Sequence, residues 1–253
     1  MKRCAMLSWL ALLGLVQTCR AAPAGVDVIT LHYYDRPPFH SRDASGHITG
    51  LVADPTNKFM NRAGIAINWQ FTPANRILTM LKFNKGMDCS PGWYKNPERE
   101  SYAQFSLPIY QDKPLVGLSR ADFRAPEGIT AKELFSQPET RLLAKQNFSQ
   151  GAYMDALIAK MPPSHVMRVA EEVSTMVKML KADRADLIVT TQEETEIYIQ
   201  QSGFSEKDFR VLKFPDVPAV EKRYILCSKQ VPAEVIERIN RAIRDMSLPG
   251  ARQ

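Results

Sequence analysis

The chain has 253 residues, of which 45% are hydrophobic and 24% are charged, with 12 Gly and 17 Pro. This composition is that of a globular protein, long enough for one large domain or two modest lobes, and it excludes a disordered chain. The formal net charge is +6, but without residues 1–21 the chain carries 30 basic against 27 acidic residues and has no basic run. We therefore expect no nucleic-acid partner.

The N-terminal segment is typical of a secretory signal peptide. Two basic residues precede an apolar run over residues 5–16, and the small residues of "AAPAG" follow. The run is too short to span a bilayer, and the small residues offer a cleavage site for a peptidase. Cys19 suggests a lipoprotein signal as an alternative, but the two residues before it fit that signal poorly. We expect residues 1–21 to be removed and the mature protein to be exported.

Strands and helices are then predicted to alternate. The expected elements are a strand over 26–34, a hairpin loop over 41–50, a helix from Asp54 to Gly64, a strand over 65–71, a helix from Thr72 to about Lys85 and a strand at 87–90. Asp54 and Thr72 each precede a proline, a pattern that favours a helix N-cap followed by a first-turn proline. Such alternation indicates an α/β fold with largely parallel sheets.

The middle of the chain echoes this plan. "MLKFNKGMDCS" at 80–90 and "MLKADRADLIV" at 179–189 both run from a helix end through a polar turn to an aspartate at a strand start. Two similar units about a hundred residues apart suggest two lobes built on related plans. The last helix, over 232–246, has an apolar stripe that we expect to be buried, formed by Ile236, Ile239, Ile243 and Met246.

The mature chain would keep two of the four cysteines. Cys89 and Cys227 remain after removal of the signal peptide. Two cysteines in an oxidising compartment are a candidate disulfide, and two buried thiols are the alternative.

Common catalytic and cofactor motifs are absent. The sequence has no GxSxG, HExxH, GxxxxGK or GxGxxG motif, and its four histidines show no metal-binding spacing. The acidic run over 192–196 lies at a predicted helix start, where carboxylates suit the helix dipole. We therefore expect no cofactor and no metal.

Three segments resemble the landmarks of a known family. They are "YYDRPPFHSRDASGHITGL", "GMDCSPGWYKNPERESYAQFSLPIY" and "LKADRADLIVTT", which occur in this order. They look like segments of the bacterial extracellular solute-binding proteins of family 3, the polar amino acid receptors of ABC transporters. The "GWYKNPERE" wording is similar to that of an uncharacterised branch from Gram-negative bacteria. The resemblance covers essentially the whole mature chain.

The resemblance implies a type II periplasmic-binding-protein fold. Each of its two α/β lobes would be a mainly parallel sheet flanked by helices, and two crossing strands would join them, with the ligand in between. Lobe one would hold residues 22–112 and 219–253, and lobe two residues 113–218. A periplasmic monomer would capture a small carboxylate-bearing solute, an amino acid or related organic acid, and pass it to an inner-membrane ABC permease.

Arg99 matches the arginine with which the family grips a ligand's α-carboxylate. A guanidinium suits that role because its planar fork binds a carboxylate bidentately and stays charged. Taken alone, Arg99 would read as a solvated cation at a helix start.

Further site residues follow from the same resemblance. Trp93 and Tyr94 occupy the adjacent loop, where the family has smaller, hydroxyl-bearing residues. Tyr33, Tyr34 and Phe39 lie where the family places an aromatic against the ligand, although either tyrosine fits the core equally well. Asn147 to Ser149 would offer N–H groups and a hydroxyl at a helix N-terminus, which is a natural anion site.

One position departs from the family pattern. Thr191 stands where amino acid receptors have an aspartate for the α-amino group, unless the register shifts to Glu193 or Glu194. An anionic, or aromatic and anionic, ligand then fits better than a zwitterion.

Two alternative functions stay open. In an enzyme of the same fold, of the dehydratase type, Glu98, Glu193 or Glu194 would be a general acid in the cleft. The other is a ligand-sensing protein without a transporter, which the absence of an aspartate at position 191 favours.

Overall fold

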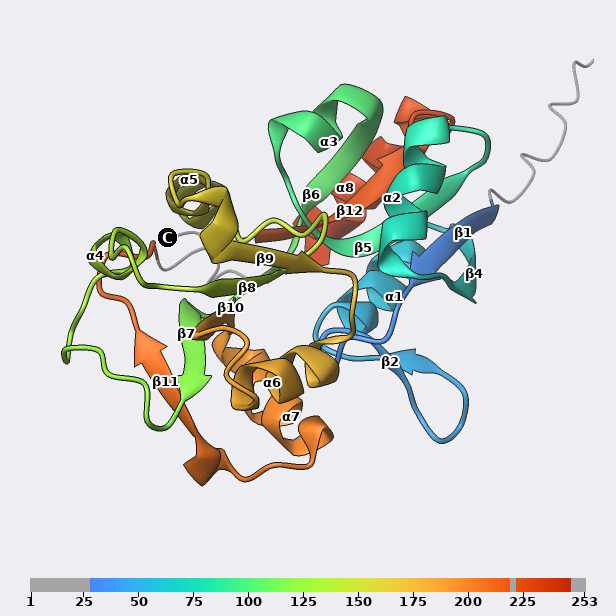
Figure 1. Cartoon of the computed structure of the whole chain (residues 1–253). Helices are drawn as coiled ribbons and strands as arrows, with labels where there is room; N and C mark the ends of the chain where they lie inside the picture. The colour runs from blue at the N-terminus through green and yellow to red at the C-terminus, as the bar shows by residue number, and fades with distance from the viewer. Residues whose placement is uncertain (1–27, 219–221, 247–253) are drawn as a thin grey trace, which may run out of the picture.

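The computed structural model describes residues 28–218 and 222–246, and the signal peptide expected over residues 1–21 lies outside them. Two five-stranded sheets, each with its own helices, lie side by side (Figure 1). In the first sheet the strand order is β4-β1-β5-β12-β6. Its strands are β1 (Val28–Tyr33), β4 (Ala66–Phe71), β5 (Asp88–Tyr94), β6 (Ala103–Gln111) and β12 (Lys222–Ser228). We call this sheet with its helices the first lobe.

Helices cover both faces of the first sheet. They are α1 (Ala53–Arg62), α2 (Ala74–Phe83), α3 (Pro97–Tyr102) and α8 (Ala233–Met246). Apolar residues of α1 and α8 share one buried cluster with Ile29 and Leu31, and those of α2 share another with Leu226. The expected stripe of α8 is buried except for Met246, which is 38% exposed because it ends the helix.

The second sheet has the strand order β11-β7-β10-β8-β9. Its strands are β7 (Leu115–Arg120), β8 (Leu142–Lys145), β9 (Val166–Val169), β10 (Leu187–Thr191) and β11 (Phe209–Lys213). Its helices are α4 (Ala131–Phe135), α5 (Ala152–Ile158), α6 (Val173–Lys181) and α7 (Gln192–Ser202). Alternate residues of β10 face opposite sides, since Leu187 packs with α4 and α5 while Ile188 packs with α6 and α7. We call this sheet with its helices the second lobe.

Short elements complete the described chain. The expected hairpin loop is present, formed by β2 (Ser41–Arg42) and β3 (Ile48–Thr49), which pair antiparallel. Two 3-10 turns, η1 (Pro163–His165) and η2 (Glu206–Asp208), precede strands. Within the described ranges, no helix is long and apolar enough to cross a membrane.

The α/β fold class is confirmed, but the sheets are mixed rather than mainly parallel. β1 pairs in parallel with β4 and β5, whereas β12 runs antiparallel to both β5 and β6. In the second sheet β7 is antiparallel to β10 and β11, while β8 is parallel to β9 and β10. β12 follows the last strand of the second lobe, β11, in the sequence. It lies between β5 and β6 in the first sheet and runs antiparallel to both.

The predicted helix caps are shifted. The N-caps of α1 and α2 are Val52 and Pro73, neither of which makes a side-chain cap hydrogen bond. Asp54 lies in the first turn of α1, while the Thr72 hydroxyl pairs with the His32 ring at 2.9 Å. Because a buried histidine needs hydrogen-bond partners, the Thr72 hydroxyl pairs with His32 and does not cap the helix.

Cys89 and Cys227 form a disulfide, so the two-thiol alternative does not hold. The two residues face each other across the antiparallel pair of β5 and β12, with Cα atoms 4.0 Å apart. The bridge therefore lies inside the first sheet.

Candidate functional site

A pocket with about 420 Å³ of space lies between the lobes and is lined from both. We call it the cleft pocket. The first lobe contributes side chains of α2 and α3, and the second lobe contributes the end of β8, the loop that follows, α5 and β9. The basic residues in its lining are Lys82, Arg99, Lys145 and Arg168, and the acidic ones are Glu98 and Asp155. The balance of charge favours an anionic occupant.

Arg99 is held firmly at the wall of the cleft pocket. It lies in the first turn of α3, where the side chain of Asn96 caps the helix by accepting from its backbone N–H at 2.9 Å. Its guanidinium donates to the carbonyls of Tyr94 at 2.7 Å and Asn147 at 3.2 Å, and lies 4.9 Å from the ring centroid of Trp93. Arg99 is 4% exposed, and this burial lowers the pKa of the guanidinium.

No carboxylate of the described residues forms an ion pair with Arg99. Its hydrogen bonds go to neutral carbonyls, and Glu98 and Asp155 act on it through their charges without contacting it in an ion pair. A charge placed in a poorly hydrated wall without a counter-ion is costly, and an incoming carboxylate would relieve that cost.

The second-lobe loop differs from the expected anion site. Helix α5 begins at Ala152, three residues after Ser149. The Ser149 hydroxyl donates to Asp155 at 2.5 Å, and the backbone N–H of Gln150 donates to the other oxygen of Asp155 at 2.8 Å. Asn147 has a positive φ of 61° and bridges the lobes by donating to Asn75 at 3.1 Å. The loop's polar groups thus satisfy the protein's own carboxylate and the opposite lobe.

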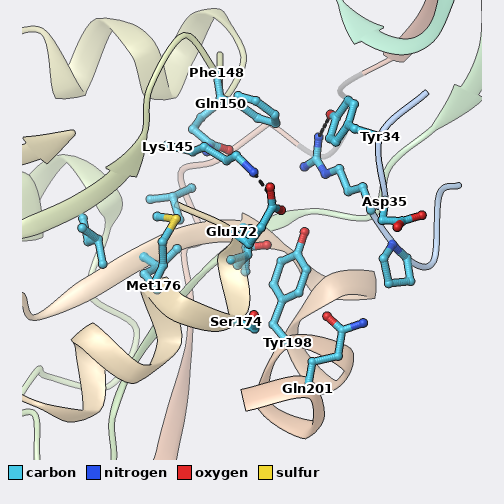
Figure 2. A pocket seen from close by; sticks show the side chains of 17 residues that line it. Tyr34, Asp35, Lys145, Phe148, Gln150, Glu172, Ser174, Met176, Tyr198 and Gln201 are labelled. Atoms are coloured by element: carbon cyan, nitrogen blue, oxygen red, sulfur yellow. Dashed lines mark hydrogen bonds and ion pairs between the residues drawn. The ribbon is translucent and has the colours of Figure 1, made fainter. Parts of the chain in front are cut away.

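Lys145 is a site residue that sequence reasoning missed. It ends the buried strand β8 and extends past the ring of Phe148, with Nζ 5.2 Å from the ring centroid, to an ion pair with Glu172 at 3.3 Å (Figure 2). Burial lowers the pKa of this ammonium, while Glu172 acts in the opposite direction. The Glu172 side chain is 72% exposed, so water weakens the pair. The signal in the sequence is a lysine that ends an apolar strand, "LLAK".

A second pocket adjoins the cleft pocket and shares Lys145, Phe148 and Gln150 with it (Figure 2). We call it the side pocket. Arg36, from the turn after β1, lies in its wall and forms a bidentate ion pair with Glu194 of α7, at 2.6 and 3.0 Å. Arg36 was also missed, although "DRPPF" places it in a proline turn directly after a buried strand. Tyr34 lines the same pocket.

Thr191 caps α7 instead of facing an open space. It is buried, and both its hydroxyl, at 2.9 Å, and its backbone N–H, at 3.4 Å, donate to Oε2 of Glu194. The carboxylate of Glu194 therefore lies directly beside position 191. Burial by itself raises the pKa of Glu194, but the charge and hydrogen bonds of Arg36 outweigh it and lower the pKa to about 2. A general acid needs a raised pKa, so this carboxylate has the opposite property.

The predicted aromatic residues divide into two groups. Trp93 and Tyr94 are buried beside Arg99, where the Trp93 ring N–H donates to Ser90 at 2.8 Å and the Tyr94 hydroxyl donates to Asp112. Both contact Arg99, Trp93 through its ring and Tyr94 through its backbone carbonyl, and so they hold the guanidinium in place.

The other aromatics lie around the turn after β1. Phe39 is fully buried, with the guanidinium of Arg36 5.3 Å from its ring centroid. Tyr33 lies apart from this group and packs edge-on against Trp69 and Phe71. Tyr33 therefore lies in a buried apolar cluster, as expected for a core residue, whereas Tyr34 lines the side pocket. No cluster of three or more potential metal ligands occurs in residues 28–218 and 222–246.

Comparisons with known proteins agree with this architecture. A family model described as bacterial extracellular solute-binding proteins, family 3, matches residues 29–251. A search among curated proteins found no match.

Solved structures show the same fold. The arginine-, lysine-, histidine-binding protein ArtJ of Geobacillus stearothermophilus has a TM-score of 0.67 and 19% identity, with 87% of this chain and 88% of that chain covered. A Gly52Ala mutant of arginine-bound ArgBP from T. maritima has a TM-score of 0.64 and 20% identity, with 87% and 95% covered. The substrate-binding protein of an amino acid ABC transporter has a TM-score of 0.65 and 18% identity, with 87% and 92% covered.

Proposed function

The chain belongs to family 3 of the bacterial extracellular solute-binding proteins, and we propose that it captures a small carboxylate-bearing solute between its lobes. Arg99 would grip the carboxylate, and Lys145 would add a second positive charge across the cleft pocket. Capture of this kind needs no covalent chemistry, only a cleft whose closed form the ligand stabilises. Removal of a signal peptide would place the protein in the periplasm.

The observation that carries the proposal is that Arg99 lines the cleft pocket and forms no ion pair there with a carboxylate of the described residues. Its guanidinium is fixed by two carbonyls and by Trp93, so that little conformational entropy is lost when a carboxylate binds. Arginine suits carboxylate recognition through its planar fork. The solute would be an amino acid or a related organic acid, in keeping with the amino acid ligands named for the structural neighbours.

Movement of the lobes would complete the cycle. We place the first lobe at residues 22–112 and 219–253 and the second at 113–218, with the crossing segments acting as hinges. The closed protein would deliver its solute as a monomer to an inner-membrane ABC permease, the kind of partner implied for one neighbour.

Thermal unfolding of the mature protein against amino acids, aromatic acids and dicarboxylates tests the proposal. A ligand at about a thousand times its dissociation constant should add roughly 4 kcal/mol, a shift of about 10 °C for a chain of this size. The shift should vanish in Arg99→Ala and shrink in Arg99→Lys, which keeps the charge but loses the fork.

Arg62→Ala is the matched control, because Arg62 is an exposed arginine of the first lobe, at the end of α1. This variant should keep the full shift. A ligand shift that persists undiminished in Arg99→Ala would contradict the role of Arg99, and an absence of any shift across the panel would favour the sensing or catalytic alternatives.

A further inference from the structure

Behind the wall of the side pocket, Arg36, Thr190 and Tyr198 of that wall surround the buried carboxylate of Glu194, and together they form a recognition site for a cation. This carboxylate is 0% exposed. Besides Arg36, it accepts hydrogen bonds from the hydroxyls of Thr190 at 3.1 Å and Thr191 at 2.9 Å, and from the hydroxyl of Tyr198. A buried carboxylate with fixed hydroxyl donors and one bidentate cation is fully satisfied.

The cation in this site is the chain's own Arg36, which reaches across from the first lobe. Its Nε and one terminal nitrogen donate to the two oxygens of Glu194 at 2.6 and 3.0 Å. Its guanidinium carbon lies 5.3 Å from the ring centroids of both Phe39 and Phe148, and its other terminal nitrogen lies 3.4 Å from the Tyr34 hydroxyl. A binding site typically recognises a guanidinium ligand with a carboxylate that accepts two hydrogen bonds from it and with aromatic rings beside it.

We propose that Arg36 is a specificity-determining residue: its tethered guanidinium occupies a cation subsite of the cleft, so that the protein selects solutes without a cationic group at this position. The inference rests on the proposed function, because it assumes that the cleft binds a solute. It explains how the chain lacks an acid at position 191 yet places a buried carboxylate nearby. The carboxylate is present, but its charge is already matched.

A tethered occupant excludes free competitors effectively. The guanidinium of Arg36 is present at its site at a high effective concentration, because the turn that bears it is part of the first lobe. A free cation must displace it and leave its charge behind in a largely buried wall, where the Arg36 side chain is 16% exposed. Removing the Arg36 side chain should let a free cation bind, because Glu194 is then left as a buried carboxylate without its ion-pair partner.

Chemical rescue of Arg36→Ala tests the inference. The probe is ethylguanidinium at low millimolar concentration, with ethylurea as its neutral counterpart of similar shape. We expect ethylguanidinium to raise the melting temperature of Arg36→Ala while ethylurea does not, and wild type to respond to neither. Calorimetry should show binding at least about tenfold tighter than to Arg36→Ala/Glu194→Gln, since a charge-assisted pair is lost in the double variant.

Poor folding of Arg36→Ala does not leave the question open. In that event both compounds are added during refolding, and recovery of folded protein with ethylguanidinium alone is the expected result. Equal effects of the two compounds, or equal rescue of the double variant, would overturn the inference.

The probe carries no carboxylate, so its outcome is independent of Arg99. An Arg99-dependent response to organic acids without guanidinium rescue would refute the cation subsite alone. Guanidinium rescue without any response to acids would refute the proposed function and leave the subsite in place.

Discussion

At the scale of single residues, charged and titratable groups are buried in the first lobe directly behind the cleft. Arg223 of β12 is 1% exposed, and its guanidinium pairs with Asp112 at 2.7 Å and donates to the carbonyl of Gly92 at 2.9 Å. His40 is buried nearby, with its Nδ1–H donating to the carbonyl of Tyr34 at 2.5 Å. The Arg223 guanidinium also lies 3.8 Å from the ring centroid of Phe39, so Arg223 and His40 both contact the turn after β1, which bears Arg36.

His40 should make stability depend on pH in mildly acidic solution. Burial, and then the charge of Arg36, lowers the pKa of His40 to about 3 from its ordinary 6.5. The unfolded chain therefore binds a proton that the folded chain does not, and stability is lost as the pH falls below 6.5 towards 3. From pH 7 to pH 5 this loss should be about 2 kcal/mol, above the range in which Glu194 titrates.

Urea unfolding at several pH values measures this loss. The loss between pH 7 and pH 5 should be smaller by that amount in His40→Gln. His47→Gln is the control, because the His47 side chain is exposed, and its profile should match that of wild type. Identical profiles for wild type and His40→Gln would contradict the assignment.

At the scale of elements, local sequence patterns predicted the elements well and the partners of their charged residues poorly. The apolar stripe of α8 and the hairpin at 41–50 were readable because each depends on periodicity or turn chemistry within a few residues. The N-caps of α1 and α2 were displaced by two residues and one residue. The direction of β12 was missed because pairing between distant strands leaves no local signal.

The same limit explains which site residues were found. Arg99 was identified through a motif, whereas Arg36 and Lys145 were missed because their roles depend on partners from other elements. The partner of Arg36 lies 158 positions away, and no pattern near "DRPPF" indicates a carboxylate in the other lobe. Tertiary pairing decides whether such a cation is solvated or buried.

The disulfide between β5 and β12 should stabilise the first lobe without affecting ligand capture. Its cysteines are 138 residues apart, so the chain-entropy model gives roughly 5 kcal/mol for closing the loop. We expect Cys89→Ala/Cys227→Ala to lose an amount of this order in urea unfolding. Ligand affinity should stay unchanged, because the bridge joins neighbouring strands of one sheet.

Reduction provides the control for this prediction. Wild type in a reducing agent should unfold at nearly the same urea concentration as the double variant, while the variant itself should not respond to reductant. A variant as stable as oxidised wild type would show that the bridge adds nothing.

At the scale of the whole molecule, polar contacts across the cleft hold the two lobes together. Besides the pair of Arg36 and Glu194, the Glu193 carboxylate at the start of α7 accepts from the Tyr110 hydroxyl at 3.1 Å and from the Lys113 backbone at 2.7 Å. These partners lie on β6 and on the segment that follows it, so that α7 is fixed to the crossing of the chain between the lobes. The contacts between the lobes thus include hydrogen bonds, the ion pair of Arg36 with Glu194, and the packing of Phe148 against Tyr34 and Trp93.

Glu194→Gln should therefore open the cleft. The variant removes the counter-ion of Arg36, and parting of the lobes would return that guanidinium to water. We expect a larger radius of gyration by small-angle X-ray scattering and faster amide hydrogen exchange in the loop after β8. Because opening hydrates Arg36, the loss of unfolding free energy should stay below the roughly 3–5 kcal/mol typical of a broken buried pair.

Asp112→Asn is the matched comparison, because it breaks the pair with Arg223 inside one lobe. Both members are almost completely buried and belong to the first lobe, so we expect roughly 3–5 kcal/mol to be lost with an unchanged radius of gyration. If Glu194→Gln behaved like Asp112→Asn, with a large loss of stability and no expansion, the ion pair across the cleft would be a part of a rigid core. If instead only Glu194→Gln expands, Arg36 and Glu194 act as a latch, and the energy of closing is set by the chain's own arginine before any solute binds.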